Sequence, residues 1–364
     1  MEYFFILGRN PELSRAEIFS YLESNKIEFT ETLHNTNFLV LDFKQDPKLD
    51  IQEFGGILKL GKILFKGNNT KFRKFLNEDE VVPSDKFSWC LFGNFPEVED
   101  ILIDKFKAER KKAMIRRGNK GVENQEGEFL TMANADFKIF CFIQTEVYFG
   151  LVEQEYSYNE IAKRDMHKPV RREELAISPR LAKILINLSQ AKKSQTLLDP
   201  FCGIGVILQE ALVKGINVIG VDIDKEAIFG AKENLKWLKE NFKTEAKFEL
   251  YNDNSKNIKL NFDCIASESS LGELLKTKVS KQEAEDIIAE FENNIIPILR
   301  NLKNIKKKNS KIAITFPFVR ETSVDPVTIC RETGLTIAKV RDIKFPIKEF
   351  RRDQFISRDI FVFE

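Results

Sequence analysis

The stretch LLDPFCGIG at residues 197–205, followed by NVIGVDID at residues 217–224, decides the fold of this chain. Its paired leucines are typical of a buried parallel strand, and Gly203 and Gly205 allow the backbone to turn tightly beside a ligand. We predict a crossover helix over residues 206–213 and a second strand that ends in an acidic residue. A glycine turn followed by an acid about one βαβ step later predicts a site for a nucleoside cofactor.

Two cofactors compete for this site. Asp222, which ends the second strand, is expected to accept hydrogen bonds from ribose hydroxyls. A dinucleotide fingerprint, GxGxxG, would require glycine at the position of Leu208, so this bulky side chain argues against NAD. S-adenosylmethionine has no phosphate and needs an open glycine turn, carboxylates and an apolar adenine slot, which DPFCGIG with Asp199 and Asp222 fits better. The alternative is an ordinary turn whose glycines only relieve strain. The presence of the two aspartates argues against this alternative.

Composition limits the classes of protein to consider. The 364 residues suffice for two or three domains, and 43% hydrophobic residues suffice for packed cores. The net charge is +1, so any nucleic-acid surface must be a local patch. Five scattered cysteines without a CxxC pair, and only two histidines, argue against disulfides and a metal site and favour a reducing, cytoplasmic location. No segment approaches the roughly 18 apolar residues of a membrane span, so no membrane partner is expected.

The N-terminal half predicts two α+β segments, residues 1–59 and residues 60–154. The first would hold two strands and a helix, at residues 3–7, 37–43 and 11–23. The second would hold three strands and a helix, at residues 87–93, 137–145, 147–154 and 96–117. Residues 155–177 are polar and have little periodicity, which predicts a linker.

The C-terminal half, residues 178–364, alternates between strand and helix patterns. An amphipathic helix is expected to begin at Pro179 behind Ser178. Further helices and strands are predicted at residues 225–241, 247–251, 262–266, 280–300 and 311–316. The extended runs 340–347 and 354–364 predict a terminal antiparallel hairpin on a doubly wound, mostly parallel Rossmann-like sheet. The carboxyl ends of its strands would bring together four acids: Asp199, Asp222, Asp253 and Glu268.

Three longer stretches carry a resemblance that spans almost the whole chain. They are ILGRNPELSRAEI (6–18), RDMHKPVRREELAISPRLAKILINLS (164–189) and LLDPFCGIGVILQEAL (197–212). The chain resembles the THUMP-domain RNA methyltransferases, and within them the archaeal and eukaryotic tRNA guanosine-10 N2-methyltransferase group. The resemblance implies a ferredoxin-like segment at 1–59, a THUMP-like RNA-binding domain at 60–154, and an S-adenosylmethionine-dependent methyltransferase domain at 178–364.

The resemblance also implies roles for single residues. It assigns Asp222 to the ribose and Asp253 to the adenine amino group. From the residues alone, Asp253 could equally be a solvated turn aspartate. The implied cofactor loop consists of Asp199, Phe201, Cys202, Gly203 and Gly205.

The expected catalytic motif departs from the family pattern. Where such enzymes carry (D/N)PP(Y/F) or a TEPYLGP-like variant, this chain has SESSLG at residues 267–272. Glu268 matches the acid, but Ser269 and Ser270 replace the proline and the aromatic ring. A lost stacking surface and a less rigid loop correspond to roughly a tenfold to thousandfold loss in rate. Three phenylalanines could replace the ring: Phe201, Phe316 or Phe318.

These features lead to two function hypotheses. The first is an active S-adenosylmethionine-dependent RNA methyltransferase that modifies a guanine N2 in tRNA, with Glu268 as the acceptor of the amine protons. The second is a catalytically degenerate homologue that binds tRNA as a binding module. A small-molecule or DNA amine methyltransferase is a weaker third reading, because it leaves the N-terminal half without a purpose. The sequence leaves open whether a small activator protein takes part.

Two basic clusters support binding of tRNA or another structured RNA. The first lies within KFKAERKKAMIRRGNK, residues 105–120, and consists of Lys107, Arg110, Lys111, Lys112, Arg116 and Arg117. The second lies in the predicted linker and includes Arg164, Arg171 and Arg172. From charge alone, the first cluster is also typical of a solvated helix face. The family resemblance favours RNA contacts.

Overall fold

The computed structural model describes residues 1–92, 96–118, 121–123, 129–131, 133–172, 177–269, 279–350 and 356–364. Its contacts group the chain into two compact units. Unit 1 comprises residues 1–11, 28–51 and 57–156, and unit 2 comprises residues 12–27, 52–56 and 157–364. This division by contacts does not test the domain boundaries expected at residues 59, 154 and 177, which stay a prediction.

Unit 1 is built on an eight-stranded sheet with the strand order β2-β3-β1-β4-β10-β9-β5-β6. Its strands are β1 (Glu2–Leu7), β2 (Phe29–His34), β3 (Phe38–Phe43), β4 (Ile57–Gly67), β5 (Lys86–Phe92), β6 (Lys112–Ile115), β9 (Phe137–Ile143) and β10 (Val147–Glu155). β5 pairs in parallel with β6 and β9, and the other pairs are antiparallel. β7 (Gly121–Glu123) and β8 (Phe129–Thr131) form a separate antiparallel pair.

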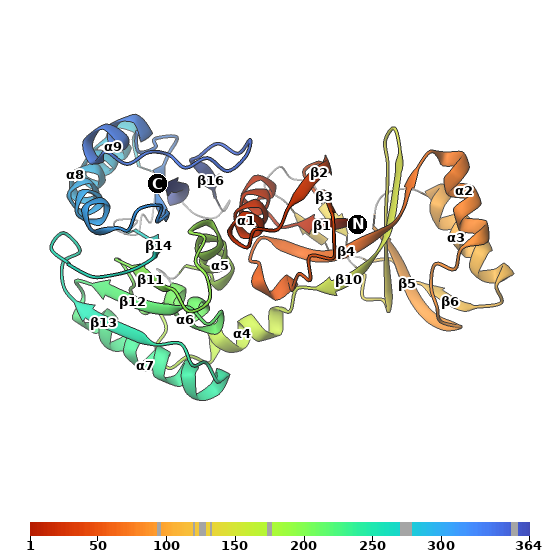
Figure 1. Cartoon of the computed structure of the whole chain (residues 1–364), viewed down its shortest axis with the longest axis horizontal. Coiled ribbons are helices and arrows are strands. Elements are labelled where there is room, and N and C mark those ends of the chain that lie inside the picture. The colour runs from red at the N-terminus through yellow and green to blue at the C-terminus, as the bar shows by residue number, and fades with distance from the viewer. Residues whose placement is uncertain are drawn as a thin grey trace. The chain divides into compact units, whose positions relative to one another are not determined.

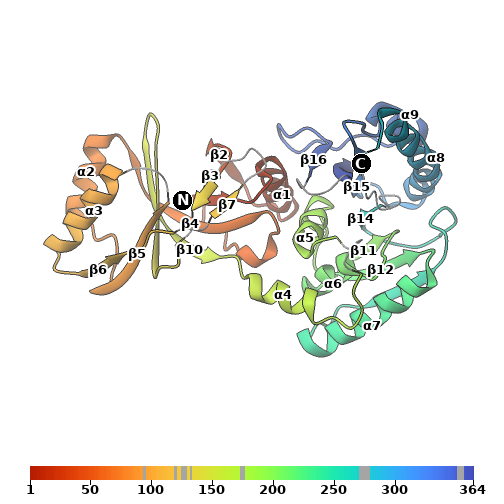
Figure 2. The same cartoon turned by 180° about the vertical axis from the view of Figure 1, so that it is seen from behind.

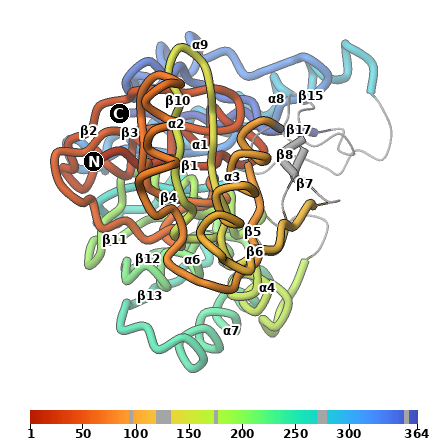
Figure 3. The backbone as a smooth tube through the Cα atoms, turned by 90° about the vertical axis from the view of Figure 1, so that its right-hand side faces the viewer, coloured from red at the N-terminus to blue at the C-terminus, as the bar shows by residue number. Residues whose placement is uncertain are grey.

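The helices of unit 1 are α2 (Asn69–Glu78) and α3 (Pro96–Ala108), which contact each other and pack against β4 and β6 (Figure 3). The predicted helix end at Arg117 is wrong. Backbone N–H groups of Arg110 and Lys111 donate to the carbonyls of the last turn, Arg110 takes a left-handed φ of 59°, and the chain continues as β6. Residues 112–115 of the basic run therefore form an edge strand.

Unit 2 contains the predicted doubly wound sheet, in the order β13-β12-β11-β14-β15-β17-β16. Its strands are β11 (Thr196–Asp199), β12 (Asn217–Asp222), β13 (Phe248–Asn252), β14 (Cys264–Glu268), β15 (Ile312–Val319), β16 (Ile347–Glu349) and β17 (Ile356–Phe363). The first five are parallel, and β17 runs antiparallel to β15 and β16. The fold class is confirmed, and so is the terminal antiparallel pair, although its first strand is Ile347–Glu349 and not the predicted run 340–347. Strand order reverses between β11 and β14, which is where such sheets bind ligands.

Helices cover both faces of this sheet. The helices of unit 2 after residue 157 are α4 (Tyr158–Met166), α5 (Pro179–Leu188), α6 (Val206–Val213), α7 (Lys225–Phe242), α8 (Lys281–Ile305) and α9 (Pro326–Thr333). Each of α5, α6 and α7 contacts the next (Figures 1 and 2), whereas α8 and α9 pack on the apolar core formed with β14, β15 and β17. Side chains of Ser178, Asp224 and Ser280 cap α5, α7 and α8. The sequence reading missed α9, and it missed α4 within the predicted linker.

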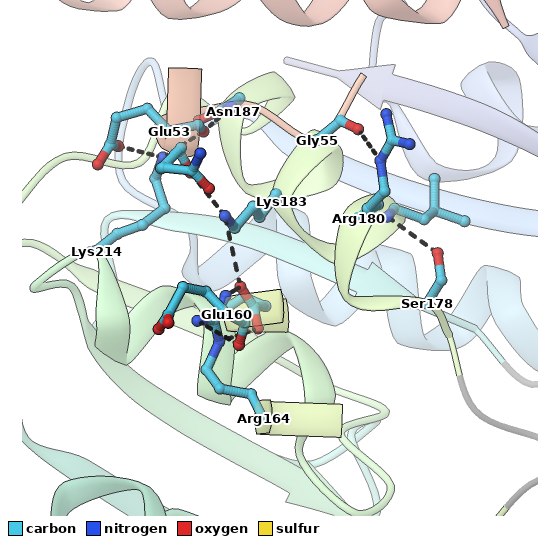
Figure 4. A network of polar contacts seen from close by, with 12 residues as sticks. Glu53, Gly55, Glu160, Arg164, Ser178, Arg180, Lys183, Asn187 and Lys214 are labelled. Carbon is cyan, nitrogen blue, oxygen red and sulfur yellow. Dashed lines mark hydrogen bonds and ion pairs between the residues drawn. The ribbon is translucent and has the colours of Figure 1, made fainter. Parts of the chain in front are cut away.

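Unit 2 also takes in α1 (Pro11–Ser24) from residue 12 onward and part of the short 3-10 helix Ile51–Glu53. The buried carboxylate of Glu17 accepts the N–H groups of Gly55 and Gly56, each at 2.7 Å, and the side-chain amide of Asn187 at 2.8 Å. The Arg180 guanidinium donates to the Gly55 carbonyl at 2.6 Å (Figure 4). Glu17 and Gly55, which come early in the sequence, thus bind residues of α5 through polar contacts.

Within the described residues, no helix is both long and apolar enough to cross a membrane.

Candidate active site

The glycine turn after β11 is held open by its backbone. Gly203 and Gly205 have φ angles of 52° and 84°, a region that glycine enters without strain. The Gly205 N–H donates to the Cys202 carbonyl, and the Cys202 N–H donates to the Val221 carbonyl. A Cβ built on Gly203 would meet no atom within 4 Å. The turn therefore presents bare backbone to open space, as a close-fitting ligand requires.

Asp222 ties this turn to the end of β12. Its carboxylate accepts the Gly203 N–H at 2.8 Å and the Asp224 N–H at 2.9 Å. The side-chain amide of Asn252, at the end of β13, donates to the carbonyls of Asp222 and Ile223. Asp222 is half-buried, so it can support the glycine turn and still present an oxygen to a ligand.

Asp199 is the buried acid of the site, with 1% of its surface exposed. Its Oδ1 accepts the Ser267 hydroxyl at 2.5 Å and the Phe201 N–H at 3.2 Å. Burial raises the pKa of Asp199 to about 7, and the negative charges of Asp222 and Glu268 act in the same direction, against the two hydrogen bonds. A cation placed beside Asp199 would favour its ionised form.

A cavity of about 550 Å³ joins these residues at the strand-order reversal. Its walls combine carboxylates with apolar side chains. The lining residues include Asp199, Phe201, Cys202, Gly203, Ile207, Asp222, Ile223, Asp253, Glu268 and Ser269. Among the predicted cofactor residues, only Gly205 is not part of the lining, because it begins α6 as its N-cap. Asp253 is exposed at the rim, and its carboxylate accepts the N–H of Asn254.

The predicted catalytic residues lie partly in this cavity. Glu268 ends β14, and its Oε1 accepts the Nε–H of Arg358 at 2.5 Å. The Ser269 hydroxyl donates to the Thr315 carbonyl at 2.6 Å, so it is engaged with β15. Ser270 lies outside the described residues.

The three phenylalanines proposed as substitutes for the stacking ring differ in position. Phe316 is fully buried in the core under α8 and has no face open to a base, so this alternative is wrong. Phe318 is half-buried, and Lys348 Nζ lies 4.1 Å from its ring centre. Phe201 is half-buried and lines the cavity, which makes it the best placed of the three.

The linker arginines predicted to contact RNA have three different environments. Arg164 is buried, and its guanidinium forms a two-pronged ion pair with Glu210 at 2.8 and 2.9 Å, so its prediction as an RNA contact is wrong. Arg172 lines the cavity and pairs with Asp224 at 2.9 Å, which places it beside the cofactor loop. Arg171 is exposed.

The first basic cluster is mostly exposed on unit 1. Lys107, Arg110, Lys112, Arg116 and Arg117 are exposed, although Lys107 and Arg117 also pair with Asp104 and Glu99. The Lys111 side chain is only 6% exposed and is held by Glu80 and Glu109, so we exclude it from an RNA surface.

Sequence reasoning missed several residues that shape the site. Ser267 donates to Asp199, the Ser255 hydroxyl donates to the Pro200 carbonyl, and Arg358 binds Glu268. The amide of Asn234 on α7 fixes both Val170 and Ile204. Serine and asparagine carry no distinctive spacing, but one signal was available: Arg358 is a charged residue within an apolar terminal strand.

Comparisons with known proteins agree with this site. Residues 168–304 match the family profile described as the RMKL-like methyltransferase domain, and residues 72–233 match a DNA methylase profile. The tRNA (guanine(10)-N2)-dimethyltransferase of Methanothermobacter thermautotrophicus is 25% identical over 304 residues, 80% of this chain and 83% of the relative. That of Pyrococcus abyssi is 23% identical over 237 residues, 65% of this chain and 68% of the relative. The methyltransferase profile thus covers the part of the chain that holds the cavity, residues 168–304.

Solved structures agree on the fold of this methyltransferase. TrmN from Thermus thermophilus has a TM-score of 0.55 at 12% identity, covering 100% of this chain and 99% of its own. A possible methylase from Clostridium difficile 630 has a TM-score of 0.50 at 15% identity, covering 100% and 98%. Both likenesses extend over the whole length of the chain.

The cofactor of the methyltransferase is S-adenosylmethionine, and the residues of the cavity fit it. The bare glycine turn allows close approach, Ile207 and Ile223 supply apolar surface, and the carboxylates suit a ligand with a sulfonium, an ammonium and a diol. Asp199 and Asp222 both lie in the walls of this cavity. The assignment of Asp222 to the ribose stays a prediction.

Replacing Asp222 by asparagine should weaken S-adenosylmethionine binding by roughly tenfold to a hundredfold, because two charge-assisted interactions, with the Gly203 N–H and with the ribose, are weakened together. Calorimetric titration measures the loss. Asp286→Asn, which removes an exposed carboxylate on α8, is the matched control. Equal affinities of the two variants would contradict the role of Asp222.

Proposed function

We propose that the protein is an S-adenosylmethionine-dependent tRNA methyltransferase that acts on a guanine N2 amine. The observation that carries the proposal is the position of Glu268, which lines the same cavity as Asp199 and Asp222. Two relatives named as tRNA (guanine(10)-N2)-dimethyltransferases, one matching over 80% of this chain, support the choice of substrate.

The chemistry needs an acceptor beside the amine. The lone pair of a guanine N2 is delocalised into the ring, so it attacks poorly unless its protons are held by acceptors that localise it. S-adenosylmethionine supplies, when bound, a methyl group on a positively charged sulfur. The Phe201 ring contacts the base, and the Glu268 carboxylate holds an amine proton. Glu268 then accepts the one proton that the amine loses as it gains the methyl group. A positioned acceptor of this kind contributes about 10²- to 10⁴-fold in rate.

RNA would be bound by the exposed cations of unit 1. In this proposal residues 60–154 form the THUMP-like RNA-binding domain, residues 1–59 are its ferredoxin-like neighbour, and the protein works in the cytoplasm. The contacts assigned to phosphates are Lys107, Arg110, Lys112, Arg116 and Arg117, joined by Arg171. β6 is the last strand of its sheet, so its exposed side chains are accessible to a nucleic acid.

Removing two of these cations should make tRNA binding weaker and less sensitive to salt. For Lys112→Gln with Arg116→Gln, we expect the slope of log K against log salt concentration to fall by about 1 to 2, because each phosphate contact releases about one counterion. The control Lys232→Gln with Lys281→Gln removes two exposed cations from α7 and α8. An unchanged slope in the first variant would remove Lys112 and Arg116 from the RNA surface.

One observation favours the second candidate function, a tRNA-binding module without activity. Glu268 is ion-paired with Arg358, and the Ser269 hydroxyl is engaged with the Thr315 carbonyl. Both candidate groups of the SESSLG motif therefore already have partners within unit 2.

The deciding experiment incubates the protein and unmodified tRNA with cofactor labelled in the methyl group, followed by digestion to nucleosides. Labelled N2-methylguanosine from the wild type, reduced at least about a hundredfold in Glu268→Gln, is expected for the enzyme. Tight tRNA and cofactor binding without transfer would establish the binding module. Label in another nucleoside would keep the methyltransferase but reject its proposed substrate.

A further inference from the structure

Arg358 is a largely buried cation in β17, a strand whose other buried residues are mostly apolar. Its side chain is 11% exposed, and that of its partner Glu268 is 12% exposed. Burying a charged pair costs desolvation that hydrophobic side chains of similar size would not incur. A purely structural role for this pair would therefore cost folding stability that an apolar side chain at this position would not.

The geometry of the contact is unusual for a sheet, because the pair spans an intervening strand. β15 lies between β14 and β17. Glu268 is opposite Thr315, whereas Arg358 is opposite Pro317, two residues further along the same face. The Arg358 side chain must cross β15 diagonally to place Nε 2.5 Å from Oε1 of Glu268. Arginine has the length and the planar, pre-organised donors for such a reach.

The charges around Glu268 make a cation necessary. Acids from three neighbouring strand ends share its cavity, Asp199, Asp222 and Asp253. Among the residues that the structure describes, the cations in the lining are Arg172 and Lys256. Arg172 is already paired with Asp224. From the terminal hairpin, Arg358 faces Glu268, and Glu349 is the cross-strand neighbour of Arg358. A buried carboxylate among like charges takes up a proton unless a cation or donors hold it charged.

We propose that Arg358 is the positioning residue of the methyl transfer: it keeps Glu268 ionised and aimed into the cavity as an acceptor for the amine proton. This inference rests on the proposed function. A protonated Glu268 would offer a hydroxyl where the amine needs an acceptor, so the role of Arg358 is exerted through Glu268. A carboxylate has two oxygens with about four lone-pair sites, so it can pair with an arginine and still accept a hydrogen bond from a base.

The activity test compares Arg358→Gln, Arg358→Lys and the control Arg331→Gln, an exposed arginine of α9. For Arg358→Gln we expect kcat at pH 7 to fall at least about thirtyfold below that of the wild type, and kcat at pH 9 to lie within about fivefold of the wild type. The KM for cofactor should change by less than about twofold. Arg358→Lys keeps a cation and should retain most of kcat and the wild-type pH profile. A uniform loss at every pH, or wild-type activity of Arg358→Gln, would overturn the proposal.

A second readout needs no activity. In Arg358→Gln, the buried Glu268 lacks its cation, so its ionisation as pH rises opposes folding. We compare Arg358→Gln with the double variant that also carries Glu268→Gln. From pH 6 to pH 9, the melting temperature of the single variant should fall by roughly 3 °C or more relative to that of the double variant. The difference between wild type and Glu268→Gln should stay constant over that range. A pH-independent gap in the Arg358→Gln background would show that Arg358 does not keep Glu268 ionised.

The two readouts separate this proposal from the proposed function. If the wild type transfers no methyl group, the proposed function fails, and the melting series alone decides whether Arg358 holds Glu268 charged. If transfer occurs but the pH profile of Arg358→Gln matches that of the wild type, the enzyme stands and the inference about Arg358 falls.

Discussion

Replacing Asp199 by asparagine should stabilise unit 2 at pH 8 and, in the same variant, greatly weaken S-adenosylmethionine binding. Burial raises the pKa of Asp199 to about 7 from an ordinary value near 3.8. A carboxyl whose pKa is raised by folding contributes its stability below the unfolded pKa and loses that stability as pH rises through the folded pKa. Keeping the charged form buried at pH 8 costs at most about 4 kcal/mol, at 1.36 kcal/mol per pKa unit.

Asparagine resembles the protonated acid in shape and cannot ionise. The unfolding free energy of Asp199→Asn should thus fall less steeply from pH 5 to pH 8 than that of the wild type, in which Asp199 ionises over the same range. The lost carboxylate also removes the negative charge that favours a cationic ligand, so stability and cofactor binding change in opposite directions.

The chain offers a clean probe for this measurement. Its two tryptophans are divided between the units, with Trp89 in unit 1 and Trp237 on α7 in unit 2. Urea unfolding followed by fluorescence in a Trp89→Phe background therefore reports on unit 2 alone, which matters because two units need not unfold in one step. Asp286→Asn is the control at an exposed position. Parallel pH profiles for Asp199→Asn and the wild type would contradict the buried charge.

The cofactor loop was predictable because short-range chemistry determines it. Glycines that take left-handed φ angles, a strand before them and an acid at the next strand end all lie within residues 197–224. The predicted helix over residues 206–213 coincides with α6. Asp199, Asp222, Asp253 and Glu268 line one cavity because parallel strands bring their carboxyl ends to one edge.

The missed features depend on contacts distant in sequence or on turns without a signature residue. The α3 helix ends near Arg110, which takes a left-handed φ where glycine would have signalled the end. Glu17 meets Asn187 across 170 residues, and Arg358 meets Glu268 across 90. Arg164 and Arg172 look alike in the sequence, yet one is buried against Glu210 and the other lines the cavity. Only the tertiary structure distinguishes them.

Replacing Arg164 by methionine should destabilise unit 2 by about 3–5 kcal/mol, the cost of removing one partner of a buried ion pair. Glu210 then keeps only the more distant contact with Lys183, at 4.0 Å, among the ion pairs of the described residues. The residue donates through Nε and Nη2 to Glu210, which is 1% exposed, and the pair lies in the network of Figure 4 that also includes Lys183 and Lys214. Methionine fills a similar volume, so the lost charge, and not a cavity, dominates the change.

The neighbouring variant Lys163→Met is the matched control, because Lys163 is 58% exposed and pairs with Glu160 on the helix surface. It should change the unfolding free energy by less than about 1 kcal/mol. Adding Glu210→Met to Arg164→Met should restore part of the loss, since the buried carboxylate that has lost its closest cation is then removed. Trp237 fluorescence in the Trp89→Phe background measures all three variants. Equal stability of Arg164→Met and Lys163→Met would show that Arg164 is not the structural ion-pair partner that the fold assigns, and would return it to the set of RNA contacts.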